Sequence, residues 1–325
     1  MLPNAIQFQS ILAPLIRKFI EEKQAIGYRY AAGTDSLKYF DRFLVEEGLN
    51  LHELPKSLIQ RWITKRTHES VSTHRGRINI VRQFAMFLVR LGYPAYVPQE
   101  KLGAKGASHF LPHILTHTEI QKLLQAVDKL TPTPYAPMRH IIMPEIFRLL
   151  YGCGFRVSEV LKLRIKDVDL NQGIVIVRES KFNKDRLVPL SAVLINRLKA
   201  YATHLEDRTP EAFFFPSPTQ GPWSKQATYF LFRKLLYQCN IAHGGRGKGP
   251  RVHDLRHTFA VHKLIQWYKE GADLNAKLPL LVIYLGHQNF SGTQKYLHLT
   301  AELFPELTLR MNSEFGDVIP RRVQK

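Results

Sequence analysis

Residues 154–163, Gly-Phe-Arg-Val-Ser-Glu-Val-Leu-Lys-Leu, indicate both a buried helix and a polar site beside it. The apolar residues of this stretch have the spacing of a core-facing helix, whereas Arg156 and Glu159 lie three residues apart at its start. An ordinary helical ion pair explains these two charges when they are considered alone. Whether these two charges belong to a functional site therefore depends on the motifs in the rest of the chain.

The sequence around this stretch predicts a mostly helical domain. Thr116-His117-Thr118-Glu119 forms a capping box before Ile120, which predicts a helix start. Pro144 is expected to begin or kink a helix that runs through Leu150. Residues 173–178 and 186–189 predict two short strands around a polar turn. The fold class is therefore mainly α with a small antiparallel β-sheet.

The first 93 residues show apolar spacing typical of helices. We expect one helix from Pro14 to Gly27 and a second that follows the N-cap Thr34 and ends at Gly48. Two more are expected over residues 58–63 and 73–91. Arg75, Arg77 and Arg82 lie off the apolar face of the fourth helix, which indicates either a solvated face or a face that follows a phosphate backbone.

A break in periodicity separates two domains. The segment 93–106 holds two prolines and two glycines and little periodicity, as in a linker. We assign residues 1–100 to a helical domain, 101–114 to the linker, and 115–325 to a second domain with a C-terminal tail.

The charge of the chain favours a polyanionic partner. Its 325 residues include 46 Lys and Arg against 27 Asp and Glu, a net charge of +19, which makes nucleic acid the leading candidate. The sequence has no uncharged apolar run long enough for a membrane span and no signal peptide. Its two cysteines form neither a disulfide framework nor a CxxC pair, so we expect a reducing, cytoplasmic setting.

A second motif, His253-Asp254-Leu255-Arg256-His257, follows a basic, glycine-rich segment at 244–251. Arg246, Lys248 and Arg251 of that segment are candidates for phosphate binding. It is not a Walker loop, because Gly249 follows Lys248 where a Ser or Thr is needed. The two histidines lack the glutamate of an HExxH zinc site, so no metal is expected.

A third motif combines Leu285-Gly286-His287 with Tyr296. One tyrosine among 13 is usually a core or surface residue. In company with two arginines and several histidines, however, its phenol can serve as the nucleophile in a site for a phosphodiester. Arginine forks match the non-bridging oxygens of a phosphate.

In these motifs the chain resembles the tyrosine recombinases of the phage integrase family. That family carries an Arg and a Glu in G-x-R-x-S-E-x-L-x-L, a Lys in a turn before R-x-V-P-L, H-x-L-R-H, L-G-H, and a Tyr nine residues later. The matching residues here are Arg156, Glu159, Lys181, His253, Arg256, His287 and Tyr296.

The resemblance implies a role for each residue. Tyr296 would be the nucleophile, Arg156 and Arg256 would hold the phosphate, and Lys181 would protonate the leaving oxygen. His253 would be a general base or hydrogen-bond donor, and His287 would donate to the phosphate. Glu159 would orient the arginine and histidine side chains without contacting the substrate. The family usually has Gly-Lys-Gly in the turn, whereas this chain has Ser180-Lys181-Phe182, so Lys184 remains an alternative to Lys181.

The resemblance also implies an activity and partners. The first domain would be a core-binding, SAM-like domain, and the whole a simple two-domain recombinase of the Xer or transposon type. It would integrate or recombine duplex DNA through a 3′-phosphotyrosine, without cofactor or metal, as a dimer on each site and a tetramer in synapsis. It would act in the cytoplasm at the nucleoid, with or without a partner recombinase. The alternatives are a relaxing enzyme similar to type IB topoisomerases and a catalytically silent DNA-binding protein.

Overall fold

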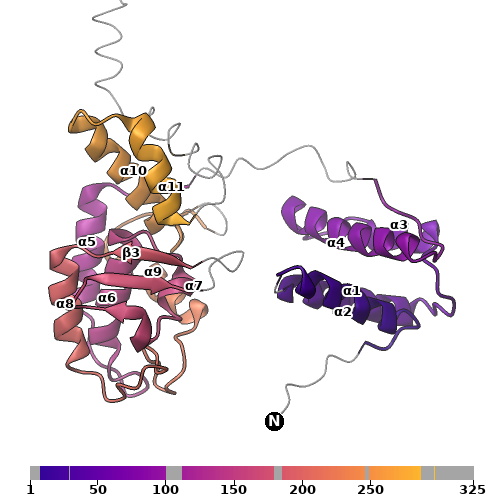
Figure 1. Ribbon diagram of the computed structural model, residues 1–325, viewed down its shortest axis with the longest axis horizontal. Helices are drawn as coiled ribbons and strands as arrows, with labels where there is room; N and C mark the ends of the chain where they lie inside the picture. Colours follow the sequence, from indigo (N-terminus) through magenta and orange to yellow (C-terminus); the bar gives the residue numbers. More distant parts are fainter. Residues whose placement is uncertain are drawn as a thin grey trace, which may run out of the picture. The chain divides into compact units, whose positions relative to one another are not determined.

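The computed structural model describes residues 8–28, 30–99, 112–178, 185–245, 249–286 and Tyr296. The chain divides into unit 1, Met1–Phe110, and unit 2, Leu111–Lys325 (Figure 1). Most of the predicted linker lies outside the described residues. No helix in the described ranges is both long and apolar enough to cross a membrane.

Unit 1 is a bundle in which α4 packs against three other helices. Its core is rich in aromatic rings, and Phe19 and Phe40 both contact Phe84 of α4. The bounds agree with the four predicted helices to within a few residues: α1 (Ala13–Ala25), α2 (Ala31–Glu46), α3 (Lys56–Ile63) and α4 (Val71–Arg90).

The predicted start of the second helix is wrong. Helix α2 begins at Ala31, after Tyr30 in the left-handed conformation (φ 47°). Thr34 therefore lies inside the helix, where its hydroxyl donates to the carbonyl of Tyr30 at 2.9 Å. A threonine can bond this backward carbonyl instead of capping a helix, and spacing alone does not distinguish the two.

Unit 2 confirms the predicted fold class, because its helices accompany one small sheet. In its described part three antiparallel strands follow the order β1-β2-β3, with Val175 opposite Val188. The strands are β1 (Val168–Asp169), β2 (Ile174–Val177) and β3 (Arg186–Pro189). The helices are α5 (His117–Asp128), α6 (Arg139–Gly152), α7 (Val157–Val160), α8 (Ala192–Ala202), α9 (Lys225–Gln238), α10 (Asp254–Lys269) and α11 (Leu274–Leu285).

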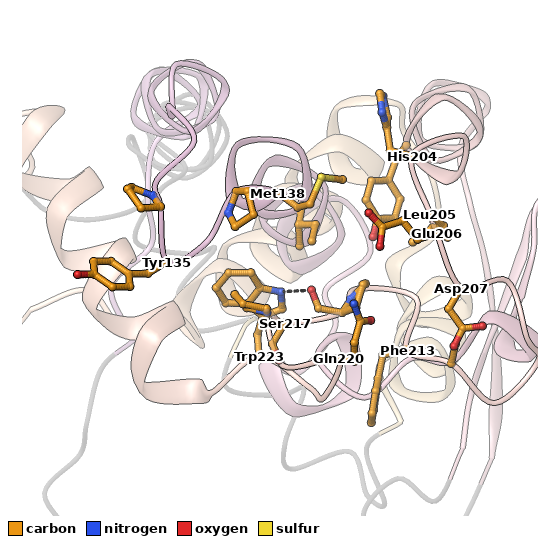
Figure 2. Close-up of a pocket in the computed structure, with 17 residues that line it drawn as sticks. Tyr135, Met138, His204, Leu205, Glu206, Asp207, Phe213, Ser217, Gln220 and Trp223 are labelled. Carbon is orange, nitrogen blue, oxygen red and sulfur yellow. Dashed lines mark hydrogen bonds between the residues drawn. The ribbon is translucent and has the colours of Figure 1, made fainter.

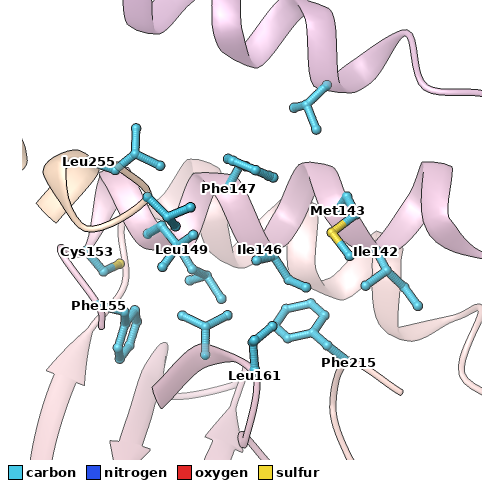
Figure 3. Close-up of a cluster of buried hydrophobic side chains, with 14 of the residues drawn as sticks. Ile142, Met143, Ile146, Phe147, Leu149, Cys153, Phe155, Leu161, Phe215 and Leu255 are labelled. Carbon is cyan, nitrogen blue, oxygen red and sulfur yellow. The ribbon is translucent and has the colours of Figure 1, made fainter. Parts of the chain in front are cut away.

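Helix α6 is the centre of unit 2. It packs against α5, α8 and α10, and its side chains Ile146, Phe147 and Leu149 are buried in the cluster that Figure 3 shows. Pro144 lies inside this helix and is itself buried, so it does not begin the helix. Figure 1 shows α10 and α11 together at one end of the unit.

The start of unit 2 is fixed to α10. The predicted capping box is confirmed, because the Thr116 hydroxyl accepts from the amide of Glu119 and the Glu119 carboxylate accepts from the amide of Thr116. The amide of Leu115 donates to the buried hydroxyl of Thr258 at 3.1 Å. One turn later His262 stacks on His117, with ring centroids 3.8 Å apart. These two contacts attach α10 to the beginning of α5 and to the residue before its cap.

The stacked histidines predict an acid-sensitive contribution to stability. Burial and the neighbouring His117 lower the pKa of His262 from 6.5 to about 4. On acidification His262 is therefore protonated at a higher pH in the unfolded chain than in the folded one. The free energy of unfolding falls as the pH drops from 6.5 towards 4. We expect His262→Phe to flatten this fall by at most about 1.4 kcal/mol per pH unit, the limit for one proton. Urea unfolding across this range measures it, and parallel curves for the two proteins would contradict it.

Candidate active site

A glycine-dependent loop places Arg156 at the start of α7. Gly154 has a φ of 61°, and a Cβ there would lie 2.6 Å from the ring of Phe259, so the loop requires glycine. Arg156 is the N-cap residue. The Glu159 carboxylate accepts from the Arg156 amide at 2.8 Å and from its Nη1 at 2.7 Å. The predicted pair at the helix start is therefore a closed ring of backbone and side-chain bonds.

Arg256 stands in the first turn of α10 and is one of the most deeply buried side chains of the described chain, with 1% of its surface exposed. Its Nη1 donates to the carbonyl of Gly154 at 2.7 Å and its Nη2 to that of Leu285. Burial and the charge of Arg156 lower its pKa, but only to about 9, so the guanidinium is cationic at neutral pH. This cation connects α10 with the loop before α7 and with α11.

Three arginines meet at the C-terminal end of α11. The consecutive carbonyls 284–286 accept, in order, from Arg186 Nε at 3.0 Å, from Arg256 and from Arg156 Nη2 at 3.0 Å. These are the carbonyls that a helix end leaves unpaired, and they carry the negative end of the helix dipole. Gly286 ends the helix in the left-handed conformation, with a φ of 66°. We call Arg156, Arg186 and Arg256 the arginine cluster.

Glu159 is the anion inside the arginine cluster. Arg186 Nη1 and Nη2 donate to its two oxygens at 2.9 and 2.7 Å. Burial alone would raise the pKa of Glu159, but hydrogen bonds and charge from Arg186, and then from Arg156, lower it to about 2. The carboxylate is therefore ionised throughout the neutral range and fixes two guanidinium groups at once.

Tyr296 lies beside this cluster with 1% of its surface exposed. Its phenol oxygen is 2.9 Å from Nδ1 of His257. Burial raises the pKa of the phenol, whereas the charge of Arg256, the charge of Arg156 and a hydrogen bond from Arg256 lower it. Burial has the larger effect, so the pKa of the phenol lies above its usual value although two cations favour its anion.

His253 precedes α10 and touches the same group of side chains. Its ring meets the ring of His257 edge-on, with centroids 4.7 Å apart. Desolvation lowers its pKa to about 4, together with repulsion from Arg256 and Arg251 and, where its ring is protonated, from His257. His253 is therefore neutral near pH 7.

The structure brings together predicted site residues that lie up to 140 positions apart. Arg156, Glu159, His253, Arg256 and Tyr296 all belong to one contiguous site. The other candidates, Lys181, Lys184, Arg246, Lys248 and His287, lie outside the described residues.

The predicted DNA-contact residues of the described chain differ in their surroundings. Arg77 is buried, and its Nε and Nη2 both bind the Glu69 carboxylate, at 2.8 and 2.7 Å, which speaks against a phosphate contact. Arg82 is half-buried and donates to a backbone carbonyl at 2.5 Å. Arg75 is half-buried, and Arg251 pairs with the buried Asp254 at 2.9 Å. The helical spacing did not distinguish these positions.

Two residues of the site were missed by the sequence analysis, Arg186 and His257. Both stand inside the motifs that were quoted, Arg186 as the first residue of R-x-V-P-L and His257 as the last of H-x-L-R-H. A buried strand that begins with arginine was the available signal for the first, since an arginine is rarely buried without a partner.

A separate pocket of about 340 Å³ lies elsewhere in unit 2 (Figure 2). Its lining includes Tyr135, Met138, Phe213 and Trp223 and no residue of the arginine cluster. The Trp223 indole donates to the carbonyl of Pro216 at 2.9 Å. Within the described ranges, no three histidine, cysteine or carboxylate side chains gather as metal ligands.

Comparison with known proteins identifies related sequences and folds. The profile of the phage integrase family matches residues 113–302. The chain is 33% identical over 271 residues to the tyrosine recombinase XerA of Thermococcus onnurineus, covering 81% of this chain and 83% of that protein. It is 29% identical over 304 residues to the integrase/recombinase y4rE of Sinorhizobium fredii, named there as putative, covering 91% and 94%.

Solved structures of recombinases share the fold, and one of them serves as an example. The recombinase XerH, bound to a palindromic difH substrate after cleavage, aligns with a TM-score of 0.65 at 16% identity, covering 94% of this chain and 98% of that chain.

The geometry of Glu159 predicts strong coupling to Arg186. We expect Arg186→Met to lower the free energy of unfolding by about 3 kcal/mol, because a buried carboxylate loses its two-bond partner. Adding Glu159→Gln should restore part of this loss, with a coupling of about 1–3 kcal/mol in a double-mutant cycle measured by urea unfolding.

The control for this cycle is Arg148, which also forms a two-bond pair, with Asp128 at 2.8 and 2.6 Å, but at a carboxylate that is 42% exposed. Arg148→Met should cost less than about 1 kcal/mol. Strictly additive losses at Arg186 and Glu159 would contradict the coupling.

Proposed function

The chain belongs to the phage integrase family, and we propose that it recombines DNA at specific sites through a covalent bond between Tyr296 and a DNA 3′-phosphate. The single observation that carries this proposal is the position of Tyr296, whose buried phenol lies beside Arg256 and Arg156, two cations that oppose the rise of its pKa on burial. A buried nucleophile beside fixed cations is suited to attack on an anionic substrate.

In the proposed first step the phenol oxygen of Tyr296 attacks a phosphorus of the DNA backbone. A bond forms between that oxygen and phosphorus, the bond to the 5′-oxygen breaks, and the released 5′-hydroxyl later attacks the phosphotyrosine of the partner strand. The number of phosphoester bonds is unchanged, so the exchange needs no nucleotide triphosphate.

The arginines would stabilise the charge of the pentacovalent state. Arg156 and Arg256 each use donors on backbone carbonyls, which fixes their orientation, and a guanidinium has five N–H donors in all. Fixed donors directed at the non-bridging oxygens lower the barrier most, because they need not reorganise during the reaction. By family resemblance Lys181 or Lys184 would protonate the 5′-oxygen, with His253 and His287 completing the set.

Both units would bind the duplex. Unit 1 carries 16 basic and 9 acidic residues, a net charge of +7, and unit 2 carries +12. Arg75, Arg82 and Arg251 remain candidates for phosphate contacts. We propose that two copies occupy each DNA site and that two occupied sites meet in a tetramer, alone or with a partner recombinase.

The nucleophile is tested by Tyr296→Phe, which removes only the phenol oxygen. The variant should form no covalent protein–DNA complex on a nicked suicide duplex, while its affinity for the same duplex changes by less than about fivefold, because one lost hydrogen bond is worth about 1 kcal/mol at most here. Denaturing gels measure the first quantity and gel shifts the second.

The matched control is Tyr237→Phe, at a tyrosine that is 83% exposed, which should retain full covalent-complex formation. A covalent complex formed by Tyr296→Phe would refute the assignment. Cleavage without joining of two sites in a two-site synapsis assay would favour a relaxing enzyme instead.

The charge distribution predicts the salt dependence of binding. Affinity for a random-sequence duplex should fall with a log–log slope of about −0.9 per phosphate contacted. Unit 2 alone should bind more weakly and with a shallower slope, because the +7 of unit 1 is missing. Fluorescence anisotropy at several salt concentrations measures both, and equal slopes would show that unit 1 contributes no phosphate contacts.

A further inference from the structure

The Tyr296 phenol contacts a group that can accept its proton. The Arg256 guanidinium contains only donors, so its hydrogen bond with the phenol must be donated to the phenol oxygen. The phenol hydrogen is then directed to a different group. Nδ1 of His257, at 2.9 Å, is an acceptor when the ring is neutral and carries its hydrogen on Nε2.

We infer that His257 is a catalytic residue that removes the proton from Tyr296 as its oxygen attacks the phosphate. This inference rests on the proposed function, in which Tyr296 is the nucleophile. The family resemblance gives the role of base to His253, whereas the contact at 2.9 Å belongs to the residue one turn further along α10.

The step balances in atoms and charge. The Tyr296 oxygen gains a bond to phosphorus and gives its proton to Nδ1 of His257, and the 5′-oxygen leaves with a proton from the general acid. On rejoining, the 5′-hydroxyl attacks, and the protonated His257 returns its proton to the departing Tyr296 oxygen. One histidine therefore serves both directions of an exchange that keeps the number of phosphoester bonds unchanged.

The position of His257 on α10 favours this role. It directly follows Arg256, whose guanidinium is fixed to Gly154 and Leu285, so the base and the phosphate-binding cation are carried by one helix turn. The ring of His253 packs edge-on against His257 and is neutral, so no cation occupies that contact.

The chain contains a matched comparison on the same helix. The hydroxyl of Tyr151 lies 3.0 Å from Nδ1 of His262, the same pair of atoms in the same type of contact. Tyr151 lies on α6, and burial alone raises its pKa, without an opposing arginine. His262 is thus a control for loss of a tyrosine–histidine hydrogen bond without loss of the proposed chemistry.

The test measures the rate of covalent-complex formation on suicide duplexes that carry the site the full-length protein selects from random-sequence DNA. His257→Asn keeps a hydrogen-bond acceptor but cannot take up a proton, and we expect its rate to fall by about 100-fold or more. His262→Asn should cleave within about threefold of the wild-type rate, because it lies outside the reacting atoms. A normal rate for His257→Asn would overturn the inference.

A substrate with sulfur in place of the bridging 5′-oxygen separates the two proton transfers. A thiolate leaves without being protonated, so a variant that lacks only the general acid recovers on this substrate. His257→Asn should remain slow on it, because the proton on Tyr296 still has no acceptor. Recovery on the sulfur substrate would overturn the inference by placing His257 at the leaving group.

Chemical rescue covers the case of a variant that folds poorly. Added imidazole should restore part of the cleavage rate of His257→Ala, and an imidazole-insensitive variant with native circular dichroism and DNA affinity would overturn the inference. The proposed function fails separately, if Tyr296→Phe still forms the covalent complex. If covalent-complex formation requires Tyr296 but not His257, the inference is refuted and the proposed function stands.

Discussion

The site depends on the C-terminal end of α11. Three guanidinium groups of like charge are placed close together and largely out of water, an arrangement that repulsion and desolvation both oppose. The carbonyls 284–286 compensate, because each receives one arginine at the negative end of a helix. Glu159 adds a full negative charge that two of the arginines share. The same bonds join α7, β3, α10 and α11, so the site is also what holds this end of unit 2 together.

This arrangement leaves a charge imbalance that suits the proposed substrate. Among the residues that the structure describes, the three positive charges of the arginine cluster face one carboxylate, and the nearby Asp254 pairs with Arg251. A phosphodiester brings one negative charge, and a second develops on its oxygens as the phenol attacks. The excess positive charge is therefore larger than a bound phosphate needs and close to what the pentacovalent state needs. Such a match favours the transition state over the bound substrate, which is the condition for catalysis.

Local patterns predicted the elements of the fold, and long-range contacts determined the details that they missed. The capping box at Thr116 and the apolar spacing of α4 depend on residues within one or two turns, so they could be read from the chain. The misplaced N-cap at Thr34 arose because Tyr30 adopts a left-handed conformation that no motif encodes. Arg77 looked like a surface arginine, but its partner Glu69 folds back from the segment before α4. For the site, the motifs identified the residue types, whereas the pairing of Arg186 with Glu159 follows only from packing β3 against α7 and α11.

Helix α10 shows why residue type and contact distance together do not define a catalytic group. Its two histidines, His257 and His262, lie at nearly the same distance from a tyrosine hydroxyl, 2.9 and 3.0 Å. At His262 the partner phenol has only burial acting on it, so its proton stays and the contact serves packing. At His257 the phenol of Tyr296 is buried too, but Arg256 and Arg156 oppose the effect of burial on its pKa, which lowers the cost of moving its proton to the imidazole. Contact with the arginine cluster therefore distinguishes the Tyr296–His257 pair from the Tyr151–His262 pair. These charges, more than the sequence motif, are the reason to give His257 a role in the reaction.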